Sequence, residues 1–307
     1  MNIGAQTVAR LRLTILVLVI VGATTAIAPA ADANLYWSTG ENTIARAAND
    51  GTHVNLNFIG GAFEPLGVAV DSNHVYWING SNGSIGRANI DGTDVNQEFI
   101  TGGEHIDFVA VDGAHIYWTS GGSGLGHTSI GRAELNGANV NQHFISLTYE
   151  PGGLAVNAGN IFWGEAYNPI LNEPYETIEE ANLDGTGKHT LLKLSSDPAR
   201  GLAVDASHIY WAGDNGAGSN TIGRANLNGT NVIQQFVTAT SVPVGVAVLG
   251  EYLYWVNGQS FGATCGPSLG GSGSLGRSLI SGANAEMDWQ RCGGRGPYGL
   301  APFSAVR

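Results

Sequence analysis

The sequence has few positive charges, few charges of any kind and only two cysteines. Lysine and arginine together number 13 against 25 acidic residues, and charged residues make up 12% of the 307-residue chain. Such an acidic chain repels phosphate groups and anionic lipids, so nucleic acids and charged membrane surfaces are excluded as main partners. Two cysteines are too few for a disulfide-rich scaffold. In an exported protein they suit a single bridge between Cys265 and Cys292.

Long hydrophobic runs are absent beyond the N-terminus. Residues 1–30 combine two arginines, an apolar segment and an Ala28-Pro29-Ala30 ending, which is typical of a cleaved secretory signal peptide. A membrane anchor is the alternative, but small and polar residues inside the segment favour cleavage. Cleavage leaves 11 basic and 25 acidic residues, a net charge of −14. We expect a secreted, extracellular or periplasmic protein with no stable membrane insertion.

A short phrase is repeated along the chain: an apolar residue, an aromatic residue and a tryptophan. It occurs six times at intervals of 40 to 48 residues, and its tryptophans are Trp37, Trp77, Trp118, Trp163, Trp211 and Trp255. A fixed period in this range is typical of the blades of a β-propeller. Each repeat also carries a tight-turn dipeptide, Asp-Gly or Asn-Gly in five repeats and Ser-Gly in the last, which indicates a hairpin. The pattern predicts six blades of four strands each.

The chain begins out of phase with its own repeats. It enters at Leu35-Tyr36-Trp37 without the small-apolar segment that precedes this phrase elsewhere, and the missing segment stands near the C-terminus as Gly299-Leu300-Ala301. We expect it to supply the innermost strand of the first blade, because this closes the ring and removes free sheet edges. The prediction is an all-β, six-bladed β-propeller spanning residues 31–307.

These motifs resemble the YWTD repeats, also called class B repeats, of the low-density lipoprotein receptor family. The resemblance is carried by the Tyr-Trp phrases, by the run 85–93 and by the run 201–205. It implies a six-bladed propeller that serves as an extracellular protein-binding or structural module, without enzymatic activity. The family's Asp after Tyr-Trp-Thr is replaced in every repeat and its cysteine-rich modules are missing, which favours a stand-alone, secreted relative of bacterial type.

Ligand-binding residues are expected at one mouth of the propeller, where the loops before the innermost strands meet those after the Tyr-Trp strands. Ionisable residues stand at matching offsets in three consecutive repeats: Glu64, His105 or Asp107, and Glu150. Carboxylates from successive blades are suitable ligands for Ca²⁺ or another divalent cation. The alternative is that they are solvated loop residues of an acidic protein, since no fixed ligand spacing relates them.

Two loops are longer than their counterparts and are candidates for contact with a partner. They span residues 165–176 and 258–273, and loops of this length in a compact domain are usually functional or disordered. The candidate contact residues in these loops and in the matching loop of the fifth repeat are Glu165, Tyr167, Tyr175, Phe261 and Asp214. The alternative interpretation is that both loops are flexible and contribute nothing to binding.

Two further series of polar residues repeat so regularly that a structural role is the better hypothesis. The arginines of the third segment are expected to bond a carbonyl or acid of a neighbouring blade: Arg46, Arg87, Arg132, Arg224 and Arg277, with Glu180 in the fourth repeat. Three histidines follow an aspartate by three residues, and we expect turn chemistry there: His74, His115 and His208.

The sequence favours a monomeric, secreted propeller that binds a protein or a carbohydrate through its loop-rich face. The alternative is a metal-dependent hydrolase or lactonase with a divalent ion at the mouth of the central channel, which is an analogy from fold alone. A purely structural role in the cell envelope is a third hypothesis. The sequence identifies no catalytic residue.

Overall fold

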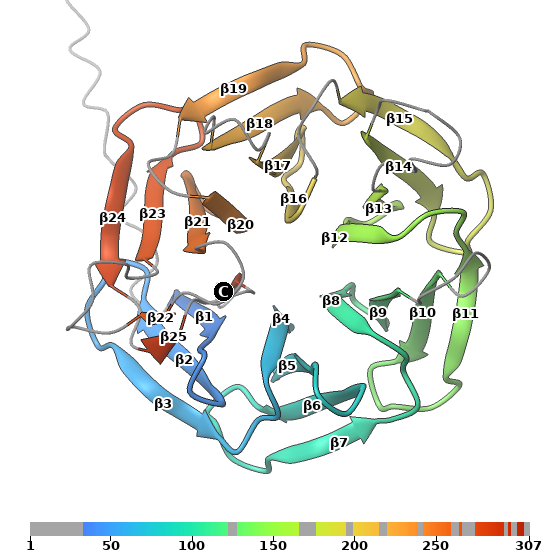
Figure 1. Cartoon of the computed structure of the whole chain (residues 1–307), viewed down its shortest axis with the longest axis vertical. Coiled ribbons are helices and arrows are strands. Elements are labelled where there is room, and N and C mark those ends of the chain that lie inside the picture. The colour runs from blue at the N-terminus through green and yellow to red at the C-terminus, as the bar shows by residue number, and fades with distance from the viewer. Residues whose placement is uncertain are drawn as a thin grey trace, which may run out of the picture.

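The computed structural model describes residues 33–303, except for 122–127, 166–175, 195–198, 215–219, 239–241, 259–263, 266–273, 292–293 and 296–299. Every regular element in these ranges is a β-strand, and no helix there is long and apolar enough to cross a membrane. Six four-stranded antiparallel sheets are arranged as blades around a central axis (Figure 1). The predicted all-β, six-bladed propeller is confirmed.

Each blade runs from an innermost strand at the axis to an outermost strand at the rim. The first three blades are β26 (Leu300–Phe303), β1 (Asn34–Ser38), β2 (Thr43–Ala48), β3 (Asn55–Gly60); β4 (Pro65–Val70), β5 (His74–Asn79), β6 (Ser84–Asn89), β7 (Asn96–Ile100); and β8 (Ile106–Val111), β9 (His115–Ser120), β10 (Ser129–Glu134), β11 (Asn141–Ser146).

The remaining three blades have the same order. They are β12 (Pro151–Val156), β13 (Asn160–Glu165), β14 (Glu176–Asn182), β15 (His189–Leu194); β16 (Leu202–Val204), β17 (His208–Asp214), β18 (Asn220–Asn226), β19 (Ile233–Thr238); and β20 (Val242–Leu249), β21 (Tyr252–Gly258), β23 (Ser274–Leu279), β24 (Glu286–Arg291). A short separate ladder joins β22 (Thr264–Cys265) to β25 (Gly294–Arg295).

The C-terminal strand completes the first blade, as predicted. Strand β26 pairs antiparallel with β1, with Leu300 opposite Trp37 and Phe303 opposite Asn34. The first and last parts of the chain therefore share one sheet (Figure 1). This pairing occupies the inner edge of β1, which would otherwise present unpaired backbone groups.

The aromatic phrase of each repeat forms the core between neighbouring blades. All six repeat tryptophans are at most 1% exposed, because each blade packs on both of its faces. Tyr36 of the first blade and Trp77 of the second belong to one buried cluster. In the third strand, Gly86 lies opposite Trp77, and a Cβ there would stand 2.2 Å from the indole atom Cε2. The glycine of the Ile-Gly-Arg-Ala segment thus leaves room for the tryptophan ring.

The innermost strands of adjacent blades approach each other at backbone distance. A Cβ on Gly201, just before β16, would lie 2.7 Å from the carbonyl oxygen of Val244 and 2.8 Å from the Cα of Gly245 in the next blade. Backbone atoms cannot move aside as the end of a side chain can. The small residues of the innermost strands therefore allow six blades to converge at the axis.

Replacing Gly201 with alanine is expected to lower the free energy of unfolding by about 1–3 kcal/mol, through overpacking against the sixth blade. The matched control is Gly60→Ala, since a Cβ at Gly60 has no atom within 4 Å. That change is expected to be neutral or to stabilise by less than about 1 kcal/mol, because alanine restricts the unfolded chain. Urea unfolding of both variants tests this, and equal midpoints would contradict it.

Candidate binding face

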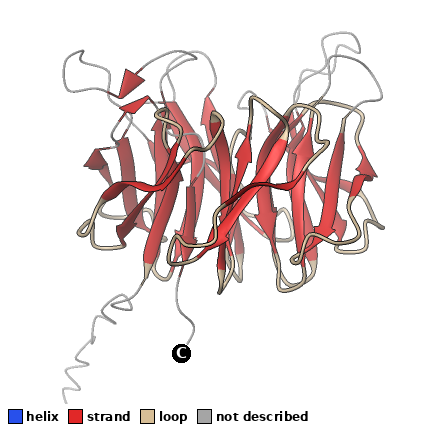
Figure 2. Cartoon of the chain, turned by 90° about the horizontal axis from the view of Figure 1, so that it is seen from below, coloured by secondary structure: helices blue, strands red, loops and turns tan. Residues whose placement is uncertain are grey.

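The two faces of the ring carry different kinds of connection. The face drawn uppermost in Figure 2, here called the upper face, receives the loops that enter the innermost strands and the loops between the second and third strands. The opposite, lower face carries the tight turns before the second strands and the third-to-fourth-strand hairpins. The described strand ends that flank both predicted long loops, Glu165 and Glu176 in the fourth blade and Gly258 and Ser274 in the sixth, belong to second-to-third-strand connections.

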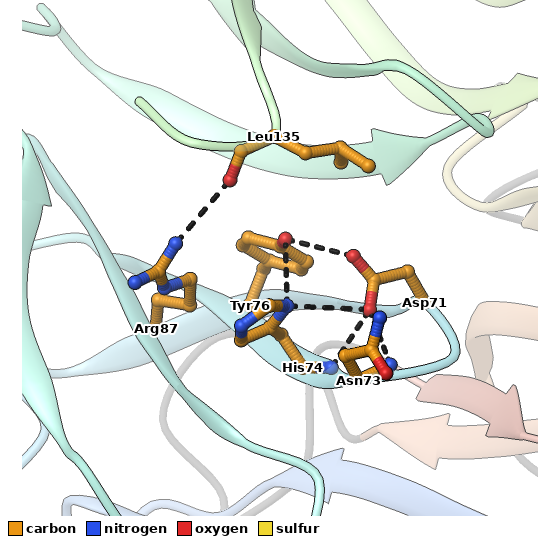
Figure 3. A network of polar contacts seen from close by, with 6 residues as sticks. All are labelled: Asp71, Asn73, His74, Tyr76, Arg87 and Leu135. Carbon is orange, nitrogen blue, oxygen red and sulfur yellow. Dashed lines mark hydrogen bonds and ion pairs between the residues drawn. The ribbon is translucent and has the colours of Figure 1, made fainter. Parts of the chain in front are cut away.

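On the lower face, polar side chains are bonded within their own turns. Asp71 accepts hydrogen bonds from the backbone N–H groups of Asn73 and His74, both at 2.7 Å, and from the hydroxyl of Tyr76 at 2.9 Å (Figure 3). Asp112 and Asp205 make the equivalent contacts in the third and fifth blades. The interpretation of the histidine series as turn chemistry agrees with this geometry.

In the hairpins of the lower face, acidic side chains also accept hydrogen bonds from residues of their own turn. Asp91 accepts hydrogen bonds from the backbone N–H and the hydroxyl of Thr93, at 3.0 and 2.6 Å, while Gly92 takes a φ of 88°. The hydroxyl bond first, and the N–H bond second, lower the pKa of Asp91 from its ordinary value. These carboxylates therefore stabilise their own hairpin turns.

Three of the five arginines in the series join neighbouring blades, as expected: Arg87, Arg132 and Arg224. The guanidinium of Arg87 donates to the carbonyl oxygen of Leu135 in the next blade at 3.3 Å (Figure 3) and lies 3.9 Å from the ring centre of Phe99. Arg132 and Arg224 repeat both contacts. Arg277 instead pairs with Glu286 of its own blade at 3.0 Å. The series is structural and does not form an anion-binding ring.

On the upper face, Glu64 and His105 occupy the same position before the innermost strand. Both adopt a left-handed backbone, with φ of 51° and 45°, and their carbonyl oxygens accept the N–H groups of Gly80 and Gly121. This geometry turns the two side chains outward, and both residues are exposed. Within the described part of the chain, the Glu64 carboxylate forms no hydrogen bond or ion pair.

Three of the predicted residues are close enough to influence one another. Burial raises the pKa of Asp107 above its ordinary value, the charge of Glu150 raises it further, and His105 opposes both effects. Glu150 lies beside Gly121, since a Cβ at that glycine would be 3.5 Å from Oε1. The third and fourth blades thus bring Asp107, Glu150 and His105 together at the upper face.

Glu64 lies elsewhere, against the first blade. Its backbone N–H donates to the side-chain oxygen of Asn42 at 3.3 Å. Among the described residues, no group of three or more His, Cys, Asp or Glu side chains is placed to hold a metal ion. The four predicted metal ligands are therefore divided between two places, and the structure does not assemble them into a coordination site.

Glu165 differs from its sequence-based expectation as an exposed loop residue. It is 6% exposed at the end of β13, where it accepts a hydrogen bond from Trp163 Nε1 at 3.0 Å and pairs with Lys188 Nζ at 3.2 Å. In the second blade this place belongs to Asn79, which accepts from Trp77 Nε1 at 3.1 Å. Position two after the tryptophan is an interior site in both blades, and the carboxylate is held there because it is paired.

The sequence analysis missed a second buried acid in the same blade and an exposed aromatic on the upper face. Glu179 is 6% exposed, lies opposite Trp163 where four other blades have glycine and the first has Ala45, and accepts a hydrogen bond from Thr190 at 2.8 Å. The sequence contained a signal for it, since Glu179 replaces the glycine or alanine of the other repeats. Phe63, directly before Glu64, is 43% exposed, and no periodic signal marks it.

Several predicted residues lie outside the part that the structure describes. Tyr167, Tyr175, Phe261 and Cys292 are among them, and for Asp214 only the backbone, at the end of β17, is described. The bridge between Cys265 and Cys292 stays a prediction. It is consistent with the pairing of Cys265 with Gly294, two residues beyond Cys292.

The central channel carries no chemistry of its own. A cavity of about 240 Å³ lies along the axis and is lined by valine, alanine and leucine residues of the six innermost strands. None of these residues has a side chain that can act as a general acid, a general base or a metal ligand. The predicted ionisable residues Glu64, His105 and Glu150 lie instead on the upper face.

Comparison with known proteins agrees with this architecture. Residues 73–100, from the turn before β5 to the end of β7, match the family model of the low-density lipoprotein receptor repeat class B. The resemblance seen in the sequence is confirmed. Within the matched residues, Asn79 accepts a hydrogen bond from Trp77 Nε1.

Solved structures show how widely this fold occurs. The six-bladed propeller is similar to a chain in the crystal structure of a nidogen/laminin complex, with a TM-score of 0.65, 20% identity, and coverage of 90% of this chain and 100% of that one. It is also similar to a putative TolB from Agrobacterium tumefaciens, with a TM-score of 0.60, 11% identity, and coverage of 86% and 91%. No curated protein sequence matches the chain. At these identities the shared property is the fold.

Proposed function

We propose that the chain is an extracellular or periplasmic binding propeller that holds a protein partner on its upper face. The observation that carries the proposal is the contrast between the two faces. Asp71 and Asp91 of the lower face are bonded within their turns, whereas the carboxylates of Glu64 and Glu150 on the upper face are exposed and form no hydrogen bond within the described residues.

The composition of the upper face suits a protein surface that carries basic groups. Exposed acids from the first four blades lie on the same face as the exposed ring of Phe63, and Glu64 is its neighbour in the chain: Glu41, Glu64, Glu104 and Glu150. An aromatic side chain beside charges of one sign is a common arrangement at protein interfaces, because the ring supplies buried area and the charges steer association. One neighbour in fold comes from a nidogen/laminin complex, so this architecture occurs in a protein assembly.

The location and the domain limits are part of the same proposal. Residues 1–30 would direct export and be removed, and residues 31–307 would act as a single propeller. A monomer is the expected form, because the closed ring pairs the inner edge of its first blade with its own C-terminus. Export is checked by sequencing the N-terminus of the protein recovered from the medium or the periplasm.

The binding face is tested by comparing two double variants. Phe63→Ala with Glu64→Lys changes the upper face, and Val95→Ala with Glu98→Lys changes exposed residues of the second blade's outer hairpin and strand. Each protein is immobilised and exposed to secreted proteins of the same culture, and bound partners are identified and then measured singly. We expect the upper-face variant to lose at least about tenfold in affinity, as removal of an interface anchor does.

The control variant is expected to bind as the wild type does. Loss of binding by the control with retention by the upper-face variant would place the interface elsewhere and overturn the proposal. Both variants must keep the wild-type melting temperature for the comparison to count.

A further inference from the structure

In the second and third blades, a glutamine of the outermost strand joins the buried tryptophan to the preceding blade. Trp77 Nε1 donates to Gln97 Oε1 at 3.1 Å, and Gln97 Nε2 donates to the carbonyl oxygen of Gly60 in the first blade at 2.9 Å. The third blade repeats both bonds, at 3.1 and 3.0 Å: Trp118 to Gln142, and Gln142 to Thr101. The bond to the preceding blade holds the amide with its oxygen toward the indole N–H.

The fifth blade has a tryptophan and a glutamine at the same two positions. The indole of Trp211 packs against Gly223 as in the other blades, since a Cβ on this glycine would stand 2.1 Å from Cε2 of the ring. The hydroxyl of Thr221 donates to the backbone carbonyl oxygen of Gln234 at 3.2 Å. The serines at this position bond the glutamines of the second and third blades in the same way, at 3.0 and 2.8 Å. Gln234 therefore starts from a backbone position within reach of the indole N–H.

The two polar groups of this pair are nevertheless not bonded to each other. Trp211 is fully buried, and both its Nε1 and Gln234 Oε1 are closed off from solvent without a hydrogen-bond partner among the described residues. The Gln234 amide also makes no hydrogen bond to the described part of the fourth blade, so the contact that orients the other two glutamines is missing here. A buried donor and a buried acceptor without partners are costly, and in native proteins an ordered water often bonds such groups.

The fifth blade also lacks a side chain that serves the second blade at this place. Asn79, two residues after Trp77, accepts from the indole Nε1 at 3.1 Å and donates through Nδ2 to Ser84 Oγ at 3.1 Å. The fifth blade has Gly213 at this position, which is buried and contributes no side chain. The amide group of asparagine is larger than a water molecule, whose share of liquid volume is about 30 Å³. The ligand that suits this place is therefore a water molecule.

We propose that a buried water molecule binds in the fifth blade beside Gly213 and replaces the asparagine side chain of the second blade. Its oxygen accepts the N–H of Trp211, and its two O–H groups donate to Gln234 Oε1 and to Thr221 Oγ1. Three hydrogen bonds are the usual number for a buried water. The water thus satisfies both groups that the protein leaves unbonded.

Nuclear magnetic resonance of the full wild-type chain with isotope-labelled tryptophan tests the proposal. We expect the indole proton of Trp211 to show a nuclear Overhauser effect to a long-lived water molecule. The indole protons of Trp77 and Trp118 should show none, because they bond directly to glutamine. These two are matched controls for protons exchanged through a hydroxyl, since each of their blades has a serine in the place of Thr221. Single Trp→Phe variants assign the signals.

Gly213→Asn supplies the missing amide and should displace the water. We expect this variant to lose the contact between Trp211 and water and to melt about 2 °C or more above the wild type. Gly60→Asn is the control for replacing a glycine, because a Cβ at Gly60 has no atom within 4 Å. It should leave the water contact of Trp211 unchanged.

Three results would overturn the proposal. A Trp211 indole proton without a water contact in the wild type would mean that the Gln234 amide turns and bonds the indole directly. Equal water contacts at Trp77, Trp118 and Trp211 would mean that the fifth blade has no special site. A contact that persists in a folded Gly213→Asn variant would place the water elsewhere. The wild-type spectra decide between the first two results and the proposal even where the variant does not fold.

Discussion

A chain that ends at residue 298 is expected to lose the stable propeller. The deletion removes β26, the innermost strand of the first blade, and with it Leu300, which is 8% exposed in a cluster with Leu35 and Trp37. The backbone edge of β1 from Asn34 to Trp37 then has no partner. Loss of one buried leucine alone costs about 2–5 kcal/mol, and an open sheet edge adds a route to aggregation.

The measurement is solubility and thermal unfolding of the truncated chain beside the full one. We expect the truncated chain either to aggregate or to melt without a cooperative transition. Adding a synthetic peptide of residues 297–307 should restore cooperative unfolding, because the vacated edge still matches that strand in register. A truncated chain that melts as the full chain does would show that closure through β26 is not needed.

Replacing Trp77 with alanine is the second change with a large expected effect. The indole is fully buried between the first and second blades, and its Nε1 donates to Asn79 and Gln97, both at 3.1 Å. Truncation leaves a cavity between two blades and removes a donor from two amide oxygens, of which Asn79 Oδ1 still accepts from the N–H of Phe63. We expect the free energy of unfolding to fall by about 3–5 kcal/mol, as for other buried tryptophans.

The packing and hydrogen-bonding parts of this effect can be separated with phenylalanine. Trp37 is equally buried, but its Nε1 has no hydrogen-bond partner within the described residues. Trp77→Phe removes ring volume and two hydrogen bonds, whereas Trp37→Phe removes ring volume only. Urea unfolding should show Trp77→Phe to be more destabilising, by about 1 kcal/mol. Equal losses would mean that these bonds contribute nothing to stability.

Much of the fold is predictable from local sequence patterns because the same packing and turn requirements recur in every blade. In five blades the tryptophan has a small residue opposite it, such as Gly86, where a Cβ would meet the indole ring, whereas the fourth blade has Glu179 there. The hairpin needs a positive φ, which explains Gly92 after Asp91. The absence of a small-apolar segment before Trp37 and its presence at Leu300 were sufficient to predict ring closure.

The candidate site was predictable only in part. Sequence offsets placed Glu64, His105 and Glu150 on one face, and the structure agrees that all three are exposed there. Offsets did not show that Glu150 lies with Asp107 while Glu64 lies against the first blade. The sequence offsets also did not identify Glu165 as an interior residue. An acidic residue after a tryptophan is assigned to a loop unless it is known that a partner, here Lys188, lies close enough to pair with it.

The sequence by itself determined the number of blades, the order of strands within each blade and the place where the ring closes. These follow from periodicity, from turn chemistry and from backbone space, which act over a few residues and repeat. Only the tertiary structure decided which charges meet, which acids are buried and which arginines join neighbouring blades. Those properties depend on contacts between residues of different blades, such as Arg87 with Leu135, and only the curvature of the closed ring brings such residues together.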